Sequence, residues 1–178
     1  MKKVMLFTIF AALMMISSAA VAQTTASGTL SVTATVTGTI NLVFNSNAAG
    51  VALSSGAGTN AATLAFGNVS AFGPLSAGVV RPAPTATTFT VSSAVDVLVS
   101  KTNSASANYT LKAQLGAADA VNTWAVGGVA VTNAAQSTLT ATGAYAANSN
   151  FPVAITVPFT TASGTLISNT INYTATAN

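Results

Sequence analysis

The sequence predicts an all-β fold, a single antiparallel β-sandwich with Greek-key connections. Short segments in which apolar residues alternate with Thr, Ser or Asn recur along the chain, and turn-forming Gly, Asn, Ser and Pro separate them. Each such segment has one face for a core and one hydroxyl-rich face for water, which is typical of antiparallel sheets. About seven to nine short strands with regular turn signals suit one sandwich domain.

The strongest alternation covers residues 30–44, where apolar residues occupy even positions and only Gly38 interrupts the apolar face. The other predicted strands are residues 89–91, 95–99, 109–115, 124–131, 153–159 and 171–175. In three of these, which begin at Tyr109, Val153 and Ile171, the apolar side chains fall on odd positions. Turns or loops are expected at residues 46–62, 73–84, 101–108 and 146–150.

The first 22 residues have the three regions of a secretory signal peptide. A basic start is followed by an uncharged apolar stretch and by small residues that end at Ala22. We expect cleavage between Ala22 and Gln23, so that residues 1–22 are removed on export. The alternative is an uncleaved membrane anchor, because the uncharged run over residues 4–22 is nearly long enough to span a bilayer. No second apolar segment of this kind follows, so we expect no stable membrane insertion.

The expected mature chain carries almost no charge. Its three basic residues, Arg81, Lys101 and Lys112, stand against two acidic ones, Asp96 and Asp119, which gives a net charge of +1. Three scattered cations cannot form the basic stripe that binds phosphates, so nucleic acid is excluded as a partner. The chain is also too hydrophobic and too weakly charged to be a disordered segment. Little charge means little repulsion between copies, which favours assembly.

The residue types that most enzymes use are missing. The chain has no His and no Cys, so it lacks the commonest general base, thiolate nucleophiles and the usual transition-metal ligands. Asp96 and Asp119 are interpreted as two solvated surface charges, since one lies in a predicted strand and the other in a predicted loop. Trp124, the only tryptophan, is interpreted as a core residue. We therefore predict a protein that is not an enzyme and has no cofactor and no metal.

The alternating N-terminal stretch is too long for one ordinary strand. Residues 29–44, fully extended, would span roughly 50 Å, whereas a typical strand spans about 17–20 Å. Either the stretch bends at Gly38, as a hinge, and serves both sheets of its own sandwich, or its first part leaves the domain. In the second case residues 26–37 form a donor strand that inserts into an open sheet of the next subunit. The candidate anchors of this strand are Leu30, Val32, Ala34 and Val36.

The chain therefore divides into a signal peptide (1–22), an N-terminal extension (23–38) and a β-sandwich domain (39–178). Four features stand together: the signal peptide, the alternating extension, residues 64–69 (Leu-Ala-Phe-Gly-Asn-Val) and a final strand that ends Ile-Asn-Tyr-Thr-Ala at residue 175. With these features the chain resembles bacterial secreted pilin-like domains. The similar groups are the archaic chaperone-usher or spore-coat-U type subunits and a related, uncharacterised exported family.

The resemblance implies an immunoglobulin-like sandwich, completed by a donor strand, that passes through the periplasm and polymerises into surface fibres. A periplasmic chaperone and an outer-membrane usher are then candidate partners. Two features depart from those families. The chain has no cysteine for the disulfide common in chaperone-usher subunits, and Ala177 replaces the penultimate aromatic residue of chaperone-bound pilins. The assembly machinery therefore stays open.

The expected function is structural: a secreted subunit that assembles with copies of itself into a surface pilus or an extracellular matrix filament. One alternative is a monomeric secreted adhesin or carbohydrate-binding sandwich, which needs an exposed aromatic cluster or an ion site. A third is a small outer-membrane β-barrel, because strands with one apolar face fit lipid-facing geometry. The sequence leaves open the role of a filament and any glycosylation at Asn68, Asn108 or Asn172, which match the Asn-x-Ser/Thr pattern.

Overall fold

A computed structural model describes residues 27–178, so the predicted signal peptide and its cleavage position at Ala22 and Gln23 lie outside the described residues. The chain divides after Thr35, and the unit Val36–Asn178 is called the body below. The described residues form β-strands, turns and loops, with no helix among them. The body is an all-β, sandwich-like fold in which every strand pairing is antiparallel. The predicted fold class is confirmed.

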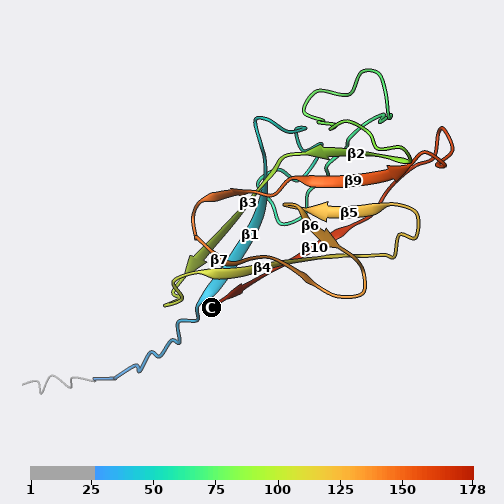
Figure 1. The fold of residues 1–178 in the computed structure, drawn as a ribbon. Coiled ribbons are helices and arrows are strands. Elements are labelled where there is room, and N and C mark those ends of the chain that lie inside the picture. Colours follow the sequence, from blue (N-terminus) through green and yellow to red (C-terminus); the bar gives the residue numbers. More distant parts are fainter. Residues whose placement is uncertain (1–26) are drawn as a thin grey trace, which may run out of the picture. The chain divides into compact units, whose positions relative to one another are not determined.

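Ten strands lie within residues 27–178 and form three sheets (Figure 1). They are β1 (Thr39–Ser46), β2 (Thr88–Ser93), β3 (Val95–Thr102), β4 (Tyr109–Leu115), β5 (Thr123–Val126), β6 (Val129–Val131), β7 (Ser137–Gly143), β8 (Asn148–Asn150), β9 (Val153–Pro158) and β10 (Ile171–Ala177). The sheets have the orders β1-β3-β8, β10-β4-β7 and β2-β9-β5-β6. Most neighbours are distant in sequence, so the chain crosses repeatedly between sheets.

Two of the sheets share a bent pair of strands. Only Ala94 separates β2 from β3, and only Phe151 and Pro152 separate β8 from β9. Strand β3 pairs with β8 and β2 pairs with β9, so the bend at Ala94 lies opposite the bend at residues 151–152. The Phe151 N–H donates to the Val95 carbonyl at 2.8 Å, and Pro152 has no N–H to continue the ladder. The interruption lets one antiparallel pair contribute to two sheets.

The core is built from alternate residues of the central strands. In β4 the side chains at odd positions, from Tyr109 to Leu115, are buried, and the even ones are only half-buried. Strand β9 follows the same rule from Val153 to Val157, as the sequence pattern predicted. Trp124 is 7% exposed and belongs to the larger of two core clusters, which confirms its interpretation as a core residue.

The predicted strand over residues 124–131 is wrong as one strand, because it is a hairpin of β5 and β6. Val126 pairs with Val129, which leaves Gly127 and Gly128 as a two-residue turn. Both glycines have positive φ, 57° and 80°, as a type I′ turn requires. This turn twists in the same sense as the strands it joins, and glycine adopts it without steric cost.

Two strands were not predicted from the sequence. Strand β8 lies in the predicted loop over residues 146–150, and its three residues are Asn, Ser and Asn. It exists because the edge of β3 is available, with Asp96 opposite Asn150. Strand β7 contains one large apolar residue, Leu139, and pairs with β4 through register shifts that break its alternation. Neither strand has the period-two apolar pattern on which the prediction depended.

Candidate functional site

The candidate donor strand has no strand structure in this chain. The first strand of the described residues begins at Thr39, so residues 30–38 are not a strand of their own sandwich, which was one of the two alternatives. Pairing of this segment in another copy stays a prediction. All strand pairings of the described residues lie within the body, and alternation alone does not form a strand without a partner for its backbone groups. Leu30, Val32 and Val36 are 88%, 81% and 74% exposed, and Ala34 is also exposed.

The exposure of these anchors is patterned. A single exposed leucine or valine is common on protein surfaces. Here apolar side chains alternate with Ser31, Thr33 and Thr35, so an extended chain would carry all of them on one side. Such a one-sided apolar strip gains free energy only when another surface covers it. The segment therefore has the composition of a strand that lacks its sheet.

Strands β1 and β10 are the natural counterpart, because each is the last strand of its sheet. Strand β1 pairs with β3 on one side, and β10 pairs with β4. The two strands come close to each other at Phe44 and Tyr173, whose rings pack edge to face with centroids 5.0 Å apart. No sheet pairing joins the two strands within the described residues.

The two strands run in opposite directions. Thr39 at the start of β1 pairs with Thr102 at the end of β3, and the following loop leads to Tyr109 at the start of β4. Tyr109 pairs with Ala177 at the end of β10. The end of β10 and the start of β1 therefore lie at the same end of the body, where Figure 1 marks the C-terminus beside the first residues of β1.

The apolar side chains on these two strands are incompletely covered. All the core-facing positions of β4 are buried, whereas the corresponding positions of β1 and β10 are only half-buried. We call this set the β1–β10 edge: Ile40, Leu42, Phe44, Ile171, Tyr173 and Ala175. Burial also raises the pKa of Tyr173, so its phenol stays protonated at physiological pH. One more strand would complete the cover of this part of the core.

A loop of the body already occupies part of the free edge of β1. The Phe44 N–H donates to the Thr59 carbonyl at 2.8 Å, and the Gly58 N–H donates to the Phe44 carbonyl at 2.7 Å. Among the described residues, no loop makes a backbone hydrogen bond to Ile40 or Leu42. None reaches the residues of β10 on its free side either. The accessible backbone therefore lies along β10 and the first half of β1.

A second feature, missed from the sequence, surrounds Asp119. Its carboxylate accepts hydrogen bonds from the Val121 N–H (3.0 Å), the Asn122 N–H (2.8 Å) and the Trp124 Nε1–H (2.8 Å). The Asn122 Nδ2 group also donates to both carboxylate oxygens. The interpretation of Asp119 as a solvated charge is therefore wrong, because the residue is half-buried and orders the turn before β5. The recognisable signal was an Asp five residues before a core tryptophan.

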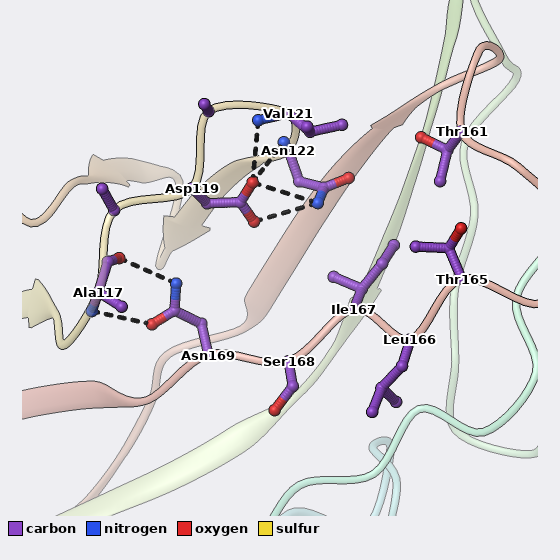
Figure 2. A pocket seen from close by; sticks show the side chains of 12 residues that line it. Ala117, Asp119, Val121, Asn122, Thr161, Thr165, Leu166, Ile167, Ser168 and Asn169 are labelled. Atoms are coloured by element: carbon purple, nitrogen blue, oxygen red, sulfur yellow. Dashed lines mark hydrogen bonds between the residues drawn. The ribbon is translucent and has the colours of Figure 1, made fainter.

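The Asp119 turn forms one side of a pocket of about 290 Å³ (Figure 2). Residues 117–122 line it from the β4–β5 loop, and Thr161 and residues 165–169 line it from the loop that leads to β10. Both carboxylate oxygens are engaged by donors of the chain itself. Asp96, the other acidic residue, accepts a hydrogen bond from Asn47 Nδ2 at 2.7 Å and belongs to β3. Asp119 orders its own loop, and Asp96 contacts the loop that follows β1.

The chain matches no protein-family model, no curated protein and no solved structure. Its function must therefore be inferred from its own geometry. Within residues 27–178, no three His, Cys, Asp or Glu residues are grouped closely enough to hold a metal ion. A helix of the length and apolarity needed to cross a membrane is not found in the same range. The exposed strip and the β1–β10 edge are the apolar features that the packing of the described residues leaves exposed or half-buried.

Gly38, the predicted hinge, stands where the extension meets the body. A Cβ atom at this position would lie 2.7 Å from the Asn103 carbonyl oxygen. Glycine is therefore needed because the backbone passes close to the β3–β4 loop, and a larger residue would have to move one of the two segments. The close approach holds Gly38 beside the β3–β4 loop, and its role as a hinge stays a prediction.

The Asp119 turn should make the stability of the body depend on pH in the acid range. Desolvation raises the pKa of Asp119, but hydrogen bonds from Asn122, Trp124 and Val121 outweigh it and lower the pKa from 3.8 to about 2. The unfolded chain then takes up the proton first as the pH falls, so this contribution is present above about pH 4 and is lost toward pH 2. Urea unfolding followed by Trp124 fluorescence measures the free energy of unfolding at each pH. Between about pH 4 and pH 2 this free energy should fall more steeply for the parent chain than for Asp119→Asn. The same pH dependence in both chains would contradict this prediction.

Proposed function

We propose that this chain is a secreted structural subunit that assembles with copies of itself into a surface pilus or an extracellular matrix filament. In this assembly the N-terminal extension of one copy inserts along β10 of the next copy, between β10 and β1. The observation that carries the proposal is a complementary pair in one chain: an exposed, alternating apolar strip and a half-buried edge that lacks a strand.

The lengths of the two elements agree. Strand β10 has seven residues, Ile171–Ala177, and the strip from Leu30 to Val36 covers the same number. An inserted strand would pair with the free backbone groups of β10 and place its apolar anchors over the β1–β10 edge. Strand addition of this kind supplies main-chain hydrogen bonds for strength and alternate side chains for register.

Stable assembly requires both the burial of apolar side chains and main-chain hydrogen bonds. Burial of Leu30, Val32 and Val36 would contribute about 4.5–9 kcal/mol, at about 1.5–3 kcal/mol for each side chain. Association itself costs about 4–15 kcal/mol in lost freedom of motion. Apolar burial alone therefore roughly balances that cost, and stable assembly depends on the hydrogen bonds to β10.

The free edge of β10 has no device that would block pairing. Monomeric proteins protect edge strands with charged residues, proline or covering loops. Strand β10 has the sequence Ile-Asn-Tyr-Thr-Ala-Thr-Ala, with no charge and no proline. An unprotected edge is a liability in a monomer, but it is what an acceptor of a strand requires. A contact between two different surfaces of identical copies propagates into a filament when it does not close into a ring.

Electron microscopy of protein secreted by the native cells tests the proposal. Negatively stained preparations should contain regular fibres, and peptide mass mapping should identify this chain in them with an N-terminus near Gln23. Dispersed monomers at high protein concentration would overturn the filament proposal and favour a monomeric binding module.

A charge on the apolar face of the extension should prevent assembly. In Val32→Asp a carboxylate would have to be buried without a partner, which costs far more than the valine contributes. Thr33→Asp is the matched control, because it carries the same charge on the polar face of the same segment. We expect fibres from Thr33→Asp and none from Val32→Asp in purified preparations viewed by electron microscopy. Equal assembly of the two variants would exclude insertion through this face.

One observation favours the alternative of a carbohydrate-binding module. Phe72 is 74% exposed and Phe159 is 41% exposed, and their ring centroids lie 6.3 Å apart. Arg81 holds the loop that bears Phe72, because its guanidinium donates to the carbonyls of Ser70 and Gly73. The two rings therefore form an exposed aromatic surface on an ordered loop.

If this aromatic surface binds polysaccharide, the Phe72→Ala variant should lose most of the binding. Co-sedimentation with insoluble polysaccharides measures it, and Val80→Ala, which truncates an apolar side chain that is 59% exposed, is the control. The same variant should leave fibre assembly unchanged, because Phe72 is not part of the extension or of the β1–β10 edge. Absence of binding by the parent chain would remove this alternative.

A further inference from the structure

The sizes of the side chains along the β1–β10 edge indicate the direction in which the extension of another copy inserts. Resting on the proposed function, we infer that the extension runs antiparallel to β10 with Ala34 beside Tyr173. The body of the donor copy then packs against the end of the acceptor that bears Val121 and Leu166. This second surface would be a contact between copies that is separate from the inserted strand.

The position of Ala34 follows from the point at which the aromatic rings of the two strands meet. The rings of Phe44 and Tyr173 are in contact there, and the bonds from Phe44 to residues 58–59 hold a loop against the same point. Only a small side chain fits over two rings that already touch. Ala34 is the smallest of the four anchors, so this is where it belongs.

The direction follows from the remaining side chains of β10. With Ala34 beside Tyr173, an antiparallel strand places Val32 beside Ala175 and Leu30 beside Ala177, so that larger anchors meet the smallest residues of β10. The parallel direction places Leu30 beyond the start of β10, beside Asn169, and leaves Ala177 without an anchor. Size matching over the full strand therefore favours the antiparallel direction.

The antiparallel direction determines where the donor body lies. Val36 reaches Ile171, at the start of β10, and only Thr37 and Gly38 then separate it from Thr39 of its own β1. The three intervening Cα steps span at most about 10 Å. The donor body must therefore sit directly against the end of the acceptor at which β10 begins.

That end of the acceptor has exposed apolar side chains. Leu166 is 88% exposed and Val121 is 58% exposed, and both line the pocket described above (Figure 2). The pocket adjoins the start of β10, because Asn169 Nδ2 donates to the Ala117 carbonyl at 3.0 Å and the Gly116 N–H donates to the Thr170 carbonyl at 2.7 Å. A second copy, entering with the end that carries Thr39, would cover these side chains.

Introduced cysteines test the direction cleanly, because the chain has none of its own. Ser31 lies beside Thr176 in the antiparallel register and beside Thr170 in the parallel one. These two positions are about 20 Å apart along the strand, and a disulfide requires Cβ atoms about 4 Å apart. Oxidised filaments of Ser31→Cys/Thr176→Cys should give a ladder of covalent oligomers, and those of Ser31→Cys/Thr170→Cys should not.

The opposite pattern would overturn the direction, and filaments that cross-link with neither pair would overturn the register. Absence of filaments from the parent chain would instead overturn the proposed function.

For the second surface, Leu166→Asp should raise the concentration needed for assembly at least about tenfold, whereas Val80→Asp should not. The Leu166→Asp body should still bind a synthetic peptide of residues 26–37. Assembly of Leu166→Asp at the parent concentration would overturn the end contact.

Discussion

A chain that lacks residues 23–36 should fold, stay soluble and form no filaments. The buried core residues lie between Phe89 and Val157, and every strand of the body lies at or after Thr39. The deletion therefore removes the donor strand and leaves every described strand pairing intact. Circular dichroism should show β structure with a cooperative thermal transition, and analytical ultracentrifugation should show a monomer.

Adding back a synthetic peptide of residues 26–37 should stabilise this shortened chain. A peptide at about one hundred times its dissociation constant adds about 2.7 kcal/mol, which corresponds to an increase in Tm of roughly 5–10 °C for a domain of this size. A peptide with Val32→Asp is the control and should leave Tm unchanged. If the shortened chain is unfolded instead, residues 23–36 belong to their own domain and the donor-strand hypothesis fails.

Replacing Gly143 by valine should destabilise the body by about 3 kcal/mol, the upper end of what overpacking costs. A Cβ atom at this position would lie 2.3 Å from the nearest carbon of the Tyr109 ring. That ring has no exposed surface and packs against Tyr145, with centroids 5.3 Å apart. It has nowhere to move, so either β7 or the smaller core cluster must shift.

Chemical denaturation measures this effect as a lower midpoint at an unchanged slope. Tyr109→Phe is the control at the same contact, because the Tyr109 hydroxyl is buried without a hydrogen-bond partner in the described chain. Its removal should therefore be neutral or slightly stabilising. A Gly143→Val chain as stable as the parent would show that Tyr109 does not pack on β7 as described.

Much of the fold could be predicted because the pattern of an antiparallel sheet is local. The odd positions of β4 and β9 are buried as predicted, since alternating side chains point to opposite faces of a strand whatever its partner. The hairpin at Gly127 and Gly128 was missed, although two glycines between apolar runs are a turn signal. Strands β7 and β8 were not readable, because their own residues carry little apolar pattern.

The candidate site, like the fold, has one part that the sequence predicted and another that it did not. The sequence by itself determined the alternating strip from Leu30 to Val36, the near absence of charge and the lack of catalytic residue types. Only the tertiary structure decided that β1 and β10 are both edge strands and that Phe44 meets Tyr173. These facts depend on pairings between residues about fifty or more positions apart, which no local pattern specifies. The alternation of apolar and polar residues is a local property of the sequence, whereas the position of a strand at the edge of a sheet depends on which other strands pair with it.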